Sequence, residues 1–375
     1  MTKKFRPNQP EKAGKELWLL NQDNFKKAAF WLVLFLIPTQ LGLHLWPSFS
    51  NVAGIRVDYL SPVIYFTDVL IFILFNFSYK PFFIFLQKQI RTNYFLIFPI
   101  IAIGAIIAKS PENALVGIFK FFELLFFGHY VFLNISQKIV AWSFIPAAIL
   151  QSAIAISQFL LKSSIGGPFY LLGERSFNGQ TPGIANASLA GDLILRPYGT
   201  LPHPNVLAGY LLFVLILIFS FKQRKSKLYF LVSLIVVFAI FLTLSRTVIF
   251  LILGYFVFSS FYYAFKRKIL KHALICLFAV MVIFLFLLSF PSRYFDFSLN
   301  QESILIRDKL VKNSISVFAI SPIFGVGLKN FLVNLPFIQK DFFLQPVHNV
   351  YLLLLSETGI LGLTYYLIFL FSMFK

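Results

Sequence analysis

Cysteine and charge are both scarce in this chain of 375 residues. The one cysteine, Cys276, lies inside an apolar stretch, so the sequence supports neither a disulfide framework nor a cluster of thiolate metal ligands. Charged residues make up 13% of the chain, and only 14 residues are acidic. So few charges cannot cover an ordinary soluble domain of this length, and we exclude that class.

Several catalytic motifs are absent as well. The acidic residues of the loops are scattered, and none forms the Asp-x-Asp pair that would hold a divalent cation. There is no Gly-x-x-x-x-Gly-Lys loop to cradle nucleotide phosphates, and no internal repeat. We therefore expect chemistry without a metal or a cofactor, in which arginines stabilise charge and the substrate carries its own energy.

Apolar sequence, by contrast, is abundant. Hydrophobic residues make up 58% of the chain, with 50 phenylalanines, and apolar stretches of about 20 residues recur along its length. We therefore expect an all-α, polytopic helical membrane protein with about ten transmembrane helices. The predicted spans are 28–46, 60–78, 93–109, 113–134, 139–161, 204–221, 228–244, 247–265, 272–290 and 349–371.

The 33 basic residues give a net charge of +19, and they follow the predicted topology. They precede the first span and recur in alternate short loops, as at Lys80, Lys88, Lys225 and Arg267. The positive-inside rule then places both termini in the cytoplasm. A nucleic-acid role would need these charges on one folded face, so we do not expect one. The first span lacks a small-residue cleavage site, and we expect it to remain as a membrane anchor.

This topology divides the chain into three parts. We expect a cytoplasmic tail at 1–27, an N-terminal transmembrane bundle at 28–161 and a larger membrane region at 162–375. The third part carries two extracytoplasmic loops, 162–203 and 291–348, that are much longer than the cytoplasmic turns. In such a protein, function most often resides in the long loops.

The sequences of the two long loops indicate different structures. Glycine and proline are dense in the first loop, which indicates ordered turns over the membrane face instead of a long helix. In the second loop, residues 302–319 alternate apolar and basic positions in a helical pattern, so we expect an interfacial amphipathic helix. That helix should stop at Ser321-Pro322, ahead of a tight turn at Gly325-Val326-Gly327.

Three arginines stand at polar breaks on the predicted outer side. Arg246 lies in the only break between the seventh and eighth spans, where a guanidinium close to hydrocarbon is costly. Arg307 lies on the predicted interfacial helix, and Arg196 leads into the sixth span. Their forked donors suit phosphate oxygens, so we predict a site for a large anionic substrate. Alternatively, Arg246 is a snorkelling helix cap, Arg196 an interfacial anchor and Arg307 a locally paired surface charge.

His348 is the candidate general base. Its imidazole accepts a proton near physiological pH, and it stands with Asn349 where a polar loop becomes a hydrophobic helix. On a continuous helix, Gly359 and Gly362 would fall near the face of His348, where small residues let another helix press close. The alternative is an interfacial histidine without a catalytic role. We expect His203 to be a structural element at a helix start.

Four ionisable residues lie inside the predicted spans, where an unpaired charge is expensive. They are Asp68, Lys120, Glu123 and Glu357. Lys120 and Glu123 are three residues apart on one helix, so we expect them to neutralise each other. Glu357 falls about half a helical revolution away from His348, and we do not expect it to be the partner of that base. Charges within spans also support a rival hypothesis, a transporter with a charged path.

These pieces occur in an order that is typical of one family. His348-Asn349 is followed after nine residues by Gly359-x-x-Gly362, which is the most specific piece. The others are Ser245-Arg246, Arg307 ahead of Pro322 to Gly327, and Arg196-Pro197-Tyr198-Gly199 with His203-Pro204-Asn205. Over roughly residues 170–365, the chain resembles the O-antigen ligase and O-antigen polymerase superfamily. Many relatives continue through a further membrane pass, whereas this chain stops at Lys375, so we expect looser packing behind the site.

The resemblance implies a GT-C-like fold and a transferase of the cell envelope, active in polysaccharide biosynthesis. A glycan on a polyprenyl diphosphate would move to a hydroxyl of a lipid, protein or glycan acceptor, on the outer face of the cytoplasmic membrane. Arg246 and Arg307, with Arg196, would hold the donor diphosphate. His348 would activate the acceptor hydroxyl, supported by Asn349 and the two glycines. The implied displacement at the anomeric carbon is inverting and needs no metal.

The same donor chemistry serves two enzymes. A ligase, which we favour, attaches the glycan to a lipid or protein, and a polymerase joins lipid-linked repeat units. From another class, a transporter or flippase of lipid-linked sugars would predict related halves and helices broken near mid-membrane, and neither is apparent. A non-catalytic scaffold would leave the arginines and His348 unexplained. The enzyme hypotheses depend on one proposition, that the arginines and the imidazole gather in one extracytoplasmic pocket.

Overall fold

The computed structural model describes residues 10–90, 96–189, 192–220, 227–267, 298–335 and 344–372. The predicted span at 272–290, and Cys276 within it, lie outside the described residues. The chain forms two compact units, and each is built from two separate segments. Unit 1 comprises Met1–Leu41 and Ile135–Asp296, and unit 2 comprises Gly42–Asn134 and Phe297–Lys375.

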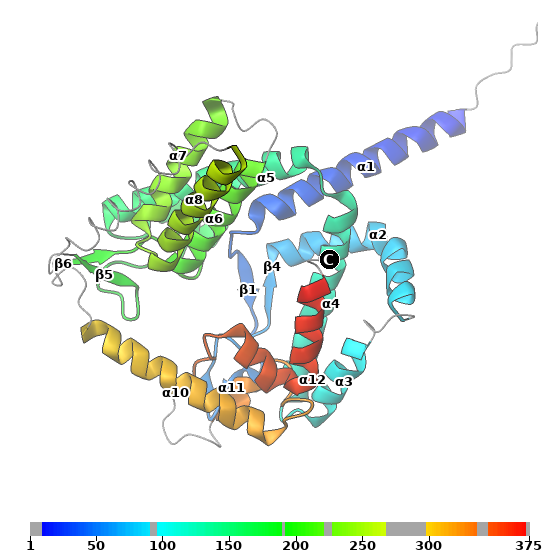
Figure 1. Cartoon of the computed structure of the whole chain (residues 1–375). Helices are drawn as coiled ribbons and strands as arrows, with labels where there is room; N and C mark the ends of the chain where they lie inside the picture. Colours follow the sequence, from blue (N-terminus) through cyan, green and yellow to red (C-terminus); the bar gives the residue numbers. More distant parts are fainter. Residues whose placement is uncertain are drawn as a thin grey trace, which may run out of the picture. The chain divides into compact units, whose positions relative to one another are not determined.

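Unit 1 is a helical bundle. Its helices are α1 (Pro10–Leu36), α5 (Gln137–Leu161), α6 (Pro204–Ser220), α7 (Lys227–Leu242) and α8 (Arg246–Arg267). Helix α5 packs on α1, α6 and α7, and α6 also packs on α7 and α8 (Figure 1). The buried side chains of α6 recur three or four residues apart, which is the spacing of one helical face. They are Leu207, Ala208, Leu211, Val214, Leu215 and Ile218.

Ordered turns connect α5 to α6 in unit 1. The short helix η3 (Gly167–Leu172) is followed by strands β5 (Asn186–Leu189) and β6 (Asp192–Leu195), which pair antiparallel with Asn186 opposite Leu195. Phe177, Leu195 and Tyr198 form a small buried cluster beneath this hairpin. The expectation of turns instead of a long helix is confirmed.

Unit 2 combines helices with two short hairpins. Its strands are β1 (Gly42–His44), β2 (Asn51–Val52), β3 (Ile55–Arg56) and β4 (Val63–Tyr65), with the short helix η1 (Ser48–Ser50) among them. Its helices are α2 (Phe66–Ile90), α3 (Ile97–Ile107), α4 (Pro111–Asn134), α10 (Ser298–Ile320), α11 (Phe331–Asn334) and α12 (Val350–Ser372). Helix α2 packs on α4, α3 packs on α4 and α12, and α10 packs on α12.

Two of the predicted spans start or end in the wrong place. Helix α1 ends at Leu36, because the residue before Pro38 is disfavoured in helical conformation. Strand β1 then pairs with β4, so the second helix begins at Phe66. The sequence analysis missed these hairpins because a short apolar run does not distinguish a strand from a helix. The chain is therefore mostly helical, with short hairpins in addition to its helices.

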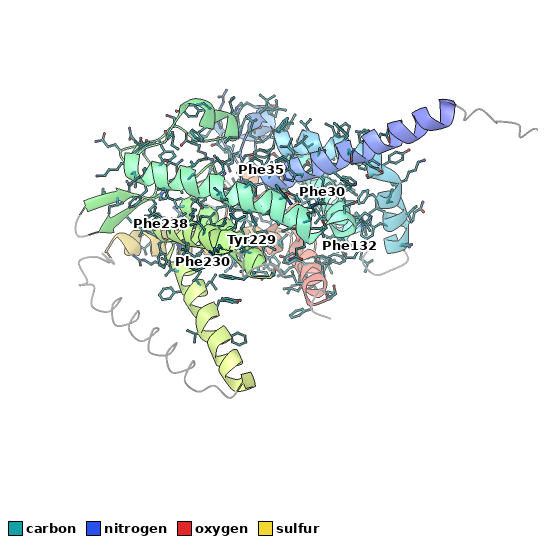
Figure 2. The ribbon with its side chains drawn as sticks, turned by 90° about the horizontal axis from the view of Figure 1, so that it is seen from above. Phe30, Phe35, Phe132, Tyr229, Phe230 and Phe238 are labelled. Atoms are coloured by element: carbon teal, nitrogen blue, oxygen red, sulfur yellow. The ribbon has the colours of Figure 1, made fainter. Side chains whose placement is uncertain are left out.

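Several helices have the length and composition of membrane spans. Four in the described part of the chain qualify, namely Phe66–Lys88, Pro111–Asn134, Gln137–Leu161 and Val350–Ser372. Shorter apolar helices accompany them at Ile97–Ile107, Pro204–Ser220 and Lys227–Leu242. Large aromatic side chains such as Phe132 and Phe230 extend outward and are 81% and 66% exposed (Figure 2). Such a surface suits lipid, and the chain is a polytopic membrane protein. The count of ten spans stays a prediction.

Candidate functional site

The structure brings Arg196 and Arg246 close together in unit 1. Arg246 begins α8, directly after the turn that ends α7. The side chain of Arg196 reaches this turn, where its Nε donates to the carbonyl oxygen of Thr243 at 2.7 Å. Its Nη2 donates to Oδ1 of Asn205, in the first turn of α6, at 2.6 Å. Burial lowers the pKa of Arg196, and the charge of the nearby Arg246 lowers it as well.

The start of α8 adds positive electrostatic potential to that of the two arginines. The first N–H groups of a helix lack intrahelical partners and carry a partial positive charge. No acidic residue occupies the first turn of α8, and the preceding Thr243 and Ser245 are buried. Two guanidinium groups and a helix N-terminus thus share one location, which is an arrangement suited to phosphate groups.

His203 stands at the start of α6, as expected. Its Nδ1 accepts a hydrogen bond from the backbone N–H of Asn205 at 3.1 Å. This bond satisfies a donor in the first turn of the helix. The prediction of a structural element at a helix start is therefore confirmed by the geometry.

In unit 2, His348 lies two residues before the start of α12, and it is exposed. Asn349 caps that helix, because its Oδ1 accepts from the backbone N–H groups of Tyr351 and Leu352 at 2.9 and 3.2 Å. Asparagine is among the preferred residues at this position. The predicted junction between a loop and a helix is confirmed, and Asn349 fixes the point at which the chain leaves His348.

The prediction that a continuous helix aligns Gly359 with His348 is wrong. Gly359 has φ 67° and ψ −172°, which breaks α12, so helical phase does not extend from one residue to the other. The element that approaches Gly359 is also not a helix but the turn after α10. A Cβ at Gly359 would overlap the carbonyl of Ile323 and lie 2.7 Å from the backbone nitrogen of Gly325.

Backbone hydrogen bonds join this turn to the break in α12. Val326 N–H donates to the carbonyl of Ser356 at 3.0 Å, and Gly327 N–H donates to that of Glu357 at 3.0 Å. In return, Ile360 N–H donates to the carbonyl of Pro322 at 2.9 Å. Gly325 and Gly327 have φ values of 73° and 94°, so the predicted tight turn is confirmed. We call this arrangement the glycine interlock.

The other predicted glycine, Gly362, contacts its own helix. A Cβ there would overlap the side chain of Thr358, one turn earlier. The hydroxyl of Thr358 donates to the carbonyl of Leu354 at 2.7 Å, which holds the threonine in this rotamer. Gly362 therefore makes room for Thr358, and a second helix packed close to this glycine stays a prediction.

Helix α10 confirms the predicted helix that carries Arg307. Its buried side chains, at Leu310, Ser314 and Val317, recur at helical spacing, whereas Arg307 is on the exposed side. Ser314 Oγ lies 2.9 Å from Ser356 Oγ and so connects α10 to α12. The local ion pair of this helix joins Lys312 to Asp308 at 2.6 Å.

Glu357 is buried next to the glycine interlock. Its Oε1 accepts from the backbone N–H of Phe331 at 3.4 Å. Burial lowers the pKa of Lys329, and the attraction of Glu357 partly opposes this shift. Glu357 therefore holds the segment between α10 and α11.

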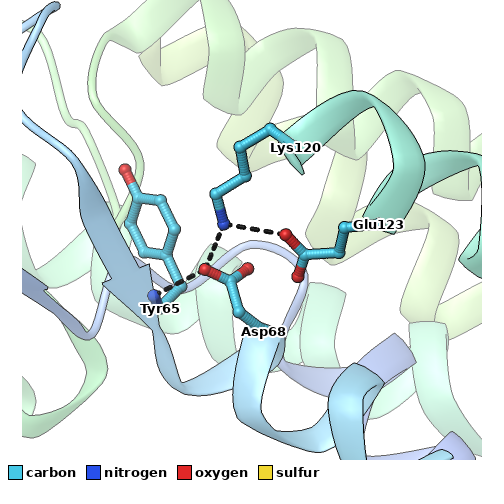
Figure 3. Close-up of polar contacts among 4 residues, drawn as sticks. All are labelled: Tyr65, Asp68, Lys120 and Glu123. Atoms are coloured by element: carbon cyan, nitrogen blue, oxygen red, sulfur yellow. Dashed lines mark hydrogen bonds and ion pairs between the residues drawn. The ribbon is translucent and has the colours of Figure 1, made fainter. Parts of the chain in front are cut away.

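Lys120 bridges two carboxylates from two helices (Figure 3). Its Nζ lies 3.0 Å from Glu123 Oε2 and also forms an ion pair with Asp68 of α2. Asp68 Oδ2 in turn accepts from Tyr65 N–H at 2.8 Å. The predicted Lys120–Glu123 pair is confirmed. The sequence analysis did not find Asp68 as a partner, because that contact depends on how α2 packs against α4.

Sequence reasoning also missed Gln151, Gln158 and Glu174. All three are buried around the segment that carries Arg196, and each makes hydrogen bonds to backbone or side-chain groups. A signal was present, because Gln151 and Gln158 are seven residues apart in an apolar helix and so share one face. Among the described residues, no three histidine, cysteine, aspartate or glutamate side chains come together as a metal site requires.

The predicted diphosphate-binding and catalytic residues are divided between the units, since Arg196 and Arg246 lie in unit 1 and Arg307 and His348 lie in unit 2. That the four gather in one pocket stays a prediction. Residues 231–367 match the family model described as O-antigen ligase, which includes all the predicted site residues except Arg196. No curated protein and no solved structure matches the chain. The resemblance predicted from the motifs is therefore confirmed over residues 231–367, which are similar to the O-antigen ligase family.

Proposed function

We propose that this chain is a membrane glycan transferase of the ligase type. It moves a glycan from a polyprenyl diphosphate to an acceptor hydroxyl on the outer face of the cytoplasmic membrane, and both its termini are cytoplasmic. The observation that carries this proposal is that the side chain of Arg196 reaches the turn at Thr243, three residues before Arg246 begins α8. An anionic ligand at such a place offsets the repulsion between the two like charges.

The arginines act on the donor diphosphate. As the bond between the anomeric carbon and the phosphate oxygen breaks, the leaving lipid diphosphate keeps the electron pair and gains negative charge. Guanidinium groups fixed beside the phosphates would stabilise this charge without reorganisation. Arg307, on the exposed side of α10, is a third contact in this proposal. The arginines thereby do the work that a divalent cation does elsewhere, and no metal is needed.

His348 acts on the acceptor. Its neutral imidazole takes the proton of the acceptor hydroxyl while the oxygen forms a bond to the anomeric carbon. Attack opposite the leaving diphosphate inverts the configuration at that carbon. The cap at Asn349 and the glycine interlock support this role, because they fix the backbone on both sides of the first part of α12.

A deletion strain tests the proposed function in the cell. Loss of a ligase should leave long glycans on the polyprenyl carrier, which are detected by extracting membranes and separating the lipid-linked sugars. Accumulated single repeat units would instead indicate the alternative function, an O-antigen-type polymerase. Lipid-linked sugars that accumulate only on the cytoplasmic face would indicate a transporter or flippase and would contradict the proposal.

A further inference from the structure

Three buried side chains that no step of the proposed reaction uses surround the segment that carries Arg196. Gln151 and Gln158 come from α5 and are fully buried, and Glu174, which follows η3, is 4% exposed. Burying this many polar atoms is costly unless each finds a partner. Their hydrogen bonds show that these side chains hold the backbone that follows Arg196.

Gln158 holds the backbone of residues 198–199 with both ends of its amide. Its Oε1 accepts from the N–H groups of Tyr198 and Gly199, each at 2.9 Å. Its Nε2 donates to the carbonyl of Gly199 and to Oε1 of Glu174, each at 2.8 Å. An amide has two donors and two acceptor positions, so every one of them is used.

Glu174 sets the direction of that amide. Its two oxygens accept from the backbone N–H groups of Ile165 and Gly166 at 2.8 and 2.7 Å, in addition to Gln158. Because the oxygens of Glu174 act as acceptors here, Gln158 presents its NH2 group to Glu174 and its oxygen to the backbone of residues 198–199.

Gln151 makes a second attachment one residue further along. Its Oε1 accepts from Thr200 N–H at 3.0 Å, and its Nε2 donates to Thr200 Oγ1 at 2.7 Å. Thr200 Oγ1 then donates to the carbonyl of Pro38 at 2.7 Å. Gly199 has φ 60°, and a Cβ there would overlap Gln151 Oε1, so this close approach requires glycine.

We propose that Gln158, Glu174 and Gln151 are positioning residues for the donor, acting through Arg196. The proposal rests on the proposed role of Arg196 and Arg246 in binding diphosphate. Arg196 lies two residues before the clamped backbone, and its Nε donates to the carbonyl oxygen of Thr243. A long side chain fixed at both ends is preorganised for its ligand, which reduces the entropy lost on binding.

A double-mutant cycle tests this proposal on the full chain in lipid nanodiscs. The ligand is polyprenyl diphosphate without a glycan, and its dissociation constant is measured directly, so that turnover is not required. Arg196→Ala should weaken binding roughly tenfold, since it removes a charge-assisted contact. Gln158→Leu should weaken binding by a similar or smaller factor. In the Arg196→Ala background, Gln158→Leu should weaken it no further, because both changes act through one guanidinium.

The controls separate positioning from simple destabilisation. Ser152→Ala changes the neighbouring buried residue of the same helix, whose hydroxyl has no partner among the described residues, and should leave the affinity unchanged. If Gln158→Leu does not fold, Glu174→Gln enters the same cycle, with an expected loss of about threefold.

Additive losses in the cycle would overturn the inference alone, as would wild-type affinity in Gln158→Leu and Glu174→Gln. Wild-type affinity in both Arg196→Ala and Arg246→Ala would instead overturn the proposed donor site, and the positioning role with it. The two failures are therefore distinguishable in one set of measurements.

Discussion

Unit 1 and unit 2 hold their candidate residues by different means. In unit 1, buried side chains of α5 fix a segment of backbone, and the two arginines near it bring charge to the start of α8. In unit 2, backbone meets backbone, and glycines allow the turn after α10 to enter the break in α12. The difference fits the two proposed tasks, since long cations that bind a ligand must be aimed at it, whereas a general base needs a fixed position on the chain.

The largest expected effect falls on the backbone of unit 2. Gly359→Ala places a Cβ against the carbonyl of Ile323 at a φ of 67°, and the nearby atoms are backbone that cannot move aside. We expect a loss of about 3 kcal/mol or more in stability, seen as loss of the monodisperse, folded protein in detergent. Gly209→Ala is the matched control, because nothing lies within 4 Å of a Cβ there. Equal behaviour of the two variants would contradict the glycine interlock.

A smaller effect should follow the loss of Lys120. Lys120→Met leaves the carboxylates of Asp68 and Glu123 facing each other without a cation between α2 and α4. We expect destabilisation of about 2 kcal/mol, measured as a lower thermal unfolding midpoint in detergent. Asp68→Asn in the same chain should recover part of the loss, whereas Lys138→Met, at an exposed position, should change little. No recovery in the double variant would contradict the role of the bridge.

Loss of the helix cap next to His348 should lower the free energy of unfolding by about 1 kcal/mol. Asn349→Ala removes the acceptor of two N–H groups at the start of α12, so stability and transfer should both fall while donor binding is retained. Asn349→Asp should restore most of both properties, because aspartate is an equally good cap. If Asn349→Ala transferred glycan at the wild-type rate, the cap would not contribute to the proposed role of His348.

The smallest effect concerns pH. Burial holds the pKa of Lys329 below the ordinary lysine value of about 10.4, so between those two values the unfolded chain binds more protons than the folded one. Stability should therefore rise as the pH is raised through this window. Thermal midpoints measured across it should show the rise, and Lys329→Met should flatten it. A wild-type midpoint that falls in this range would have the wrong sign.

How much of the structure can be predicted from the sequence depends on whether each feature is determined by residues close together in the chain. The start of α12 was predictable because Asn349 is a typical cap, and α6 begins at Pro204, where the predicted span 204–221 begins. The break at Gly359 was not, because the apolar pattern continues through it and its cause is a turn distant in sequence. The same holds for Asp68 beside Lys120, which only tertiary packing determines.

The candidate site shows the same contrast between features that are determined locally and features that depend on tertiary packing. Arg196 and Arg246 stood out individually as charges at polar breaks, but nothing local to either arginine predicts that they lie close together. Gln151 and Gln158 attract no attention in a residue-by-residue search, since glutamine has no charge and no fixed motif. Their seven-residue spacing on one helix was the only sign that a buried polar face was present.

The division of work between the units is tested most directly by comparing His348→Ala with Arg246→Ala in one reconstituted assay. Donor affinity and the transfer rate at saturating donor are measured for each variant with a glycan on polyprenyl diphosphate. His348→Ala should lose transfer by about a hundredfold or more while its donor affinity stays near the wild-type value. Arg246→Ala should lose donor affinity by about tenfold or more. Wild-type turnover in His348→Ala, or unchanged donor affinity in Arg246→Ala, would contradict the account.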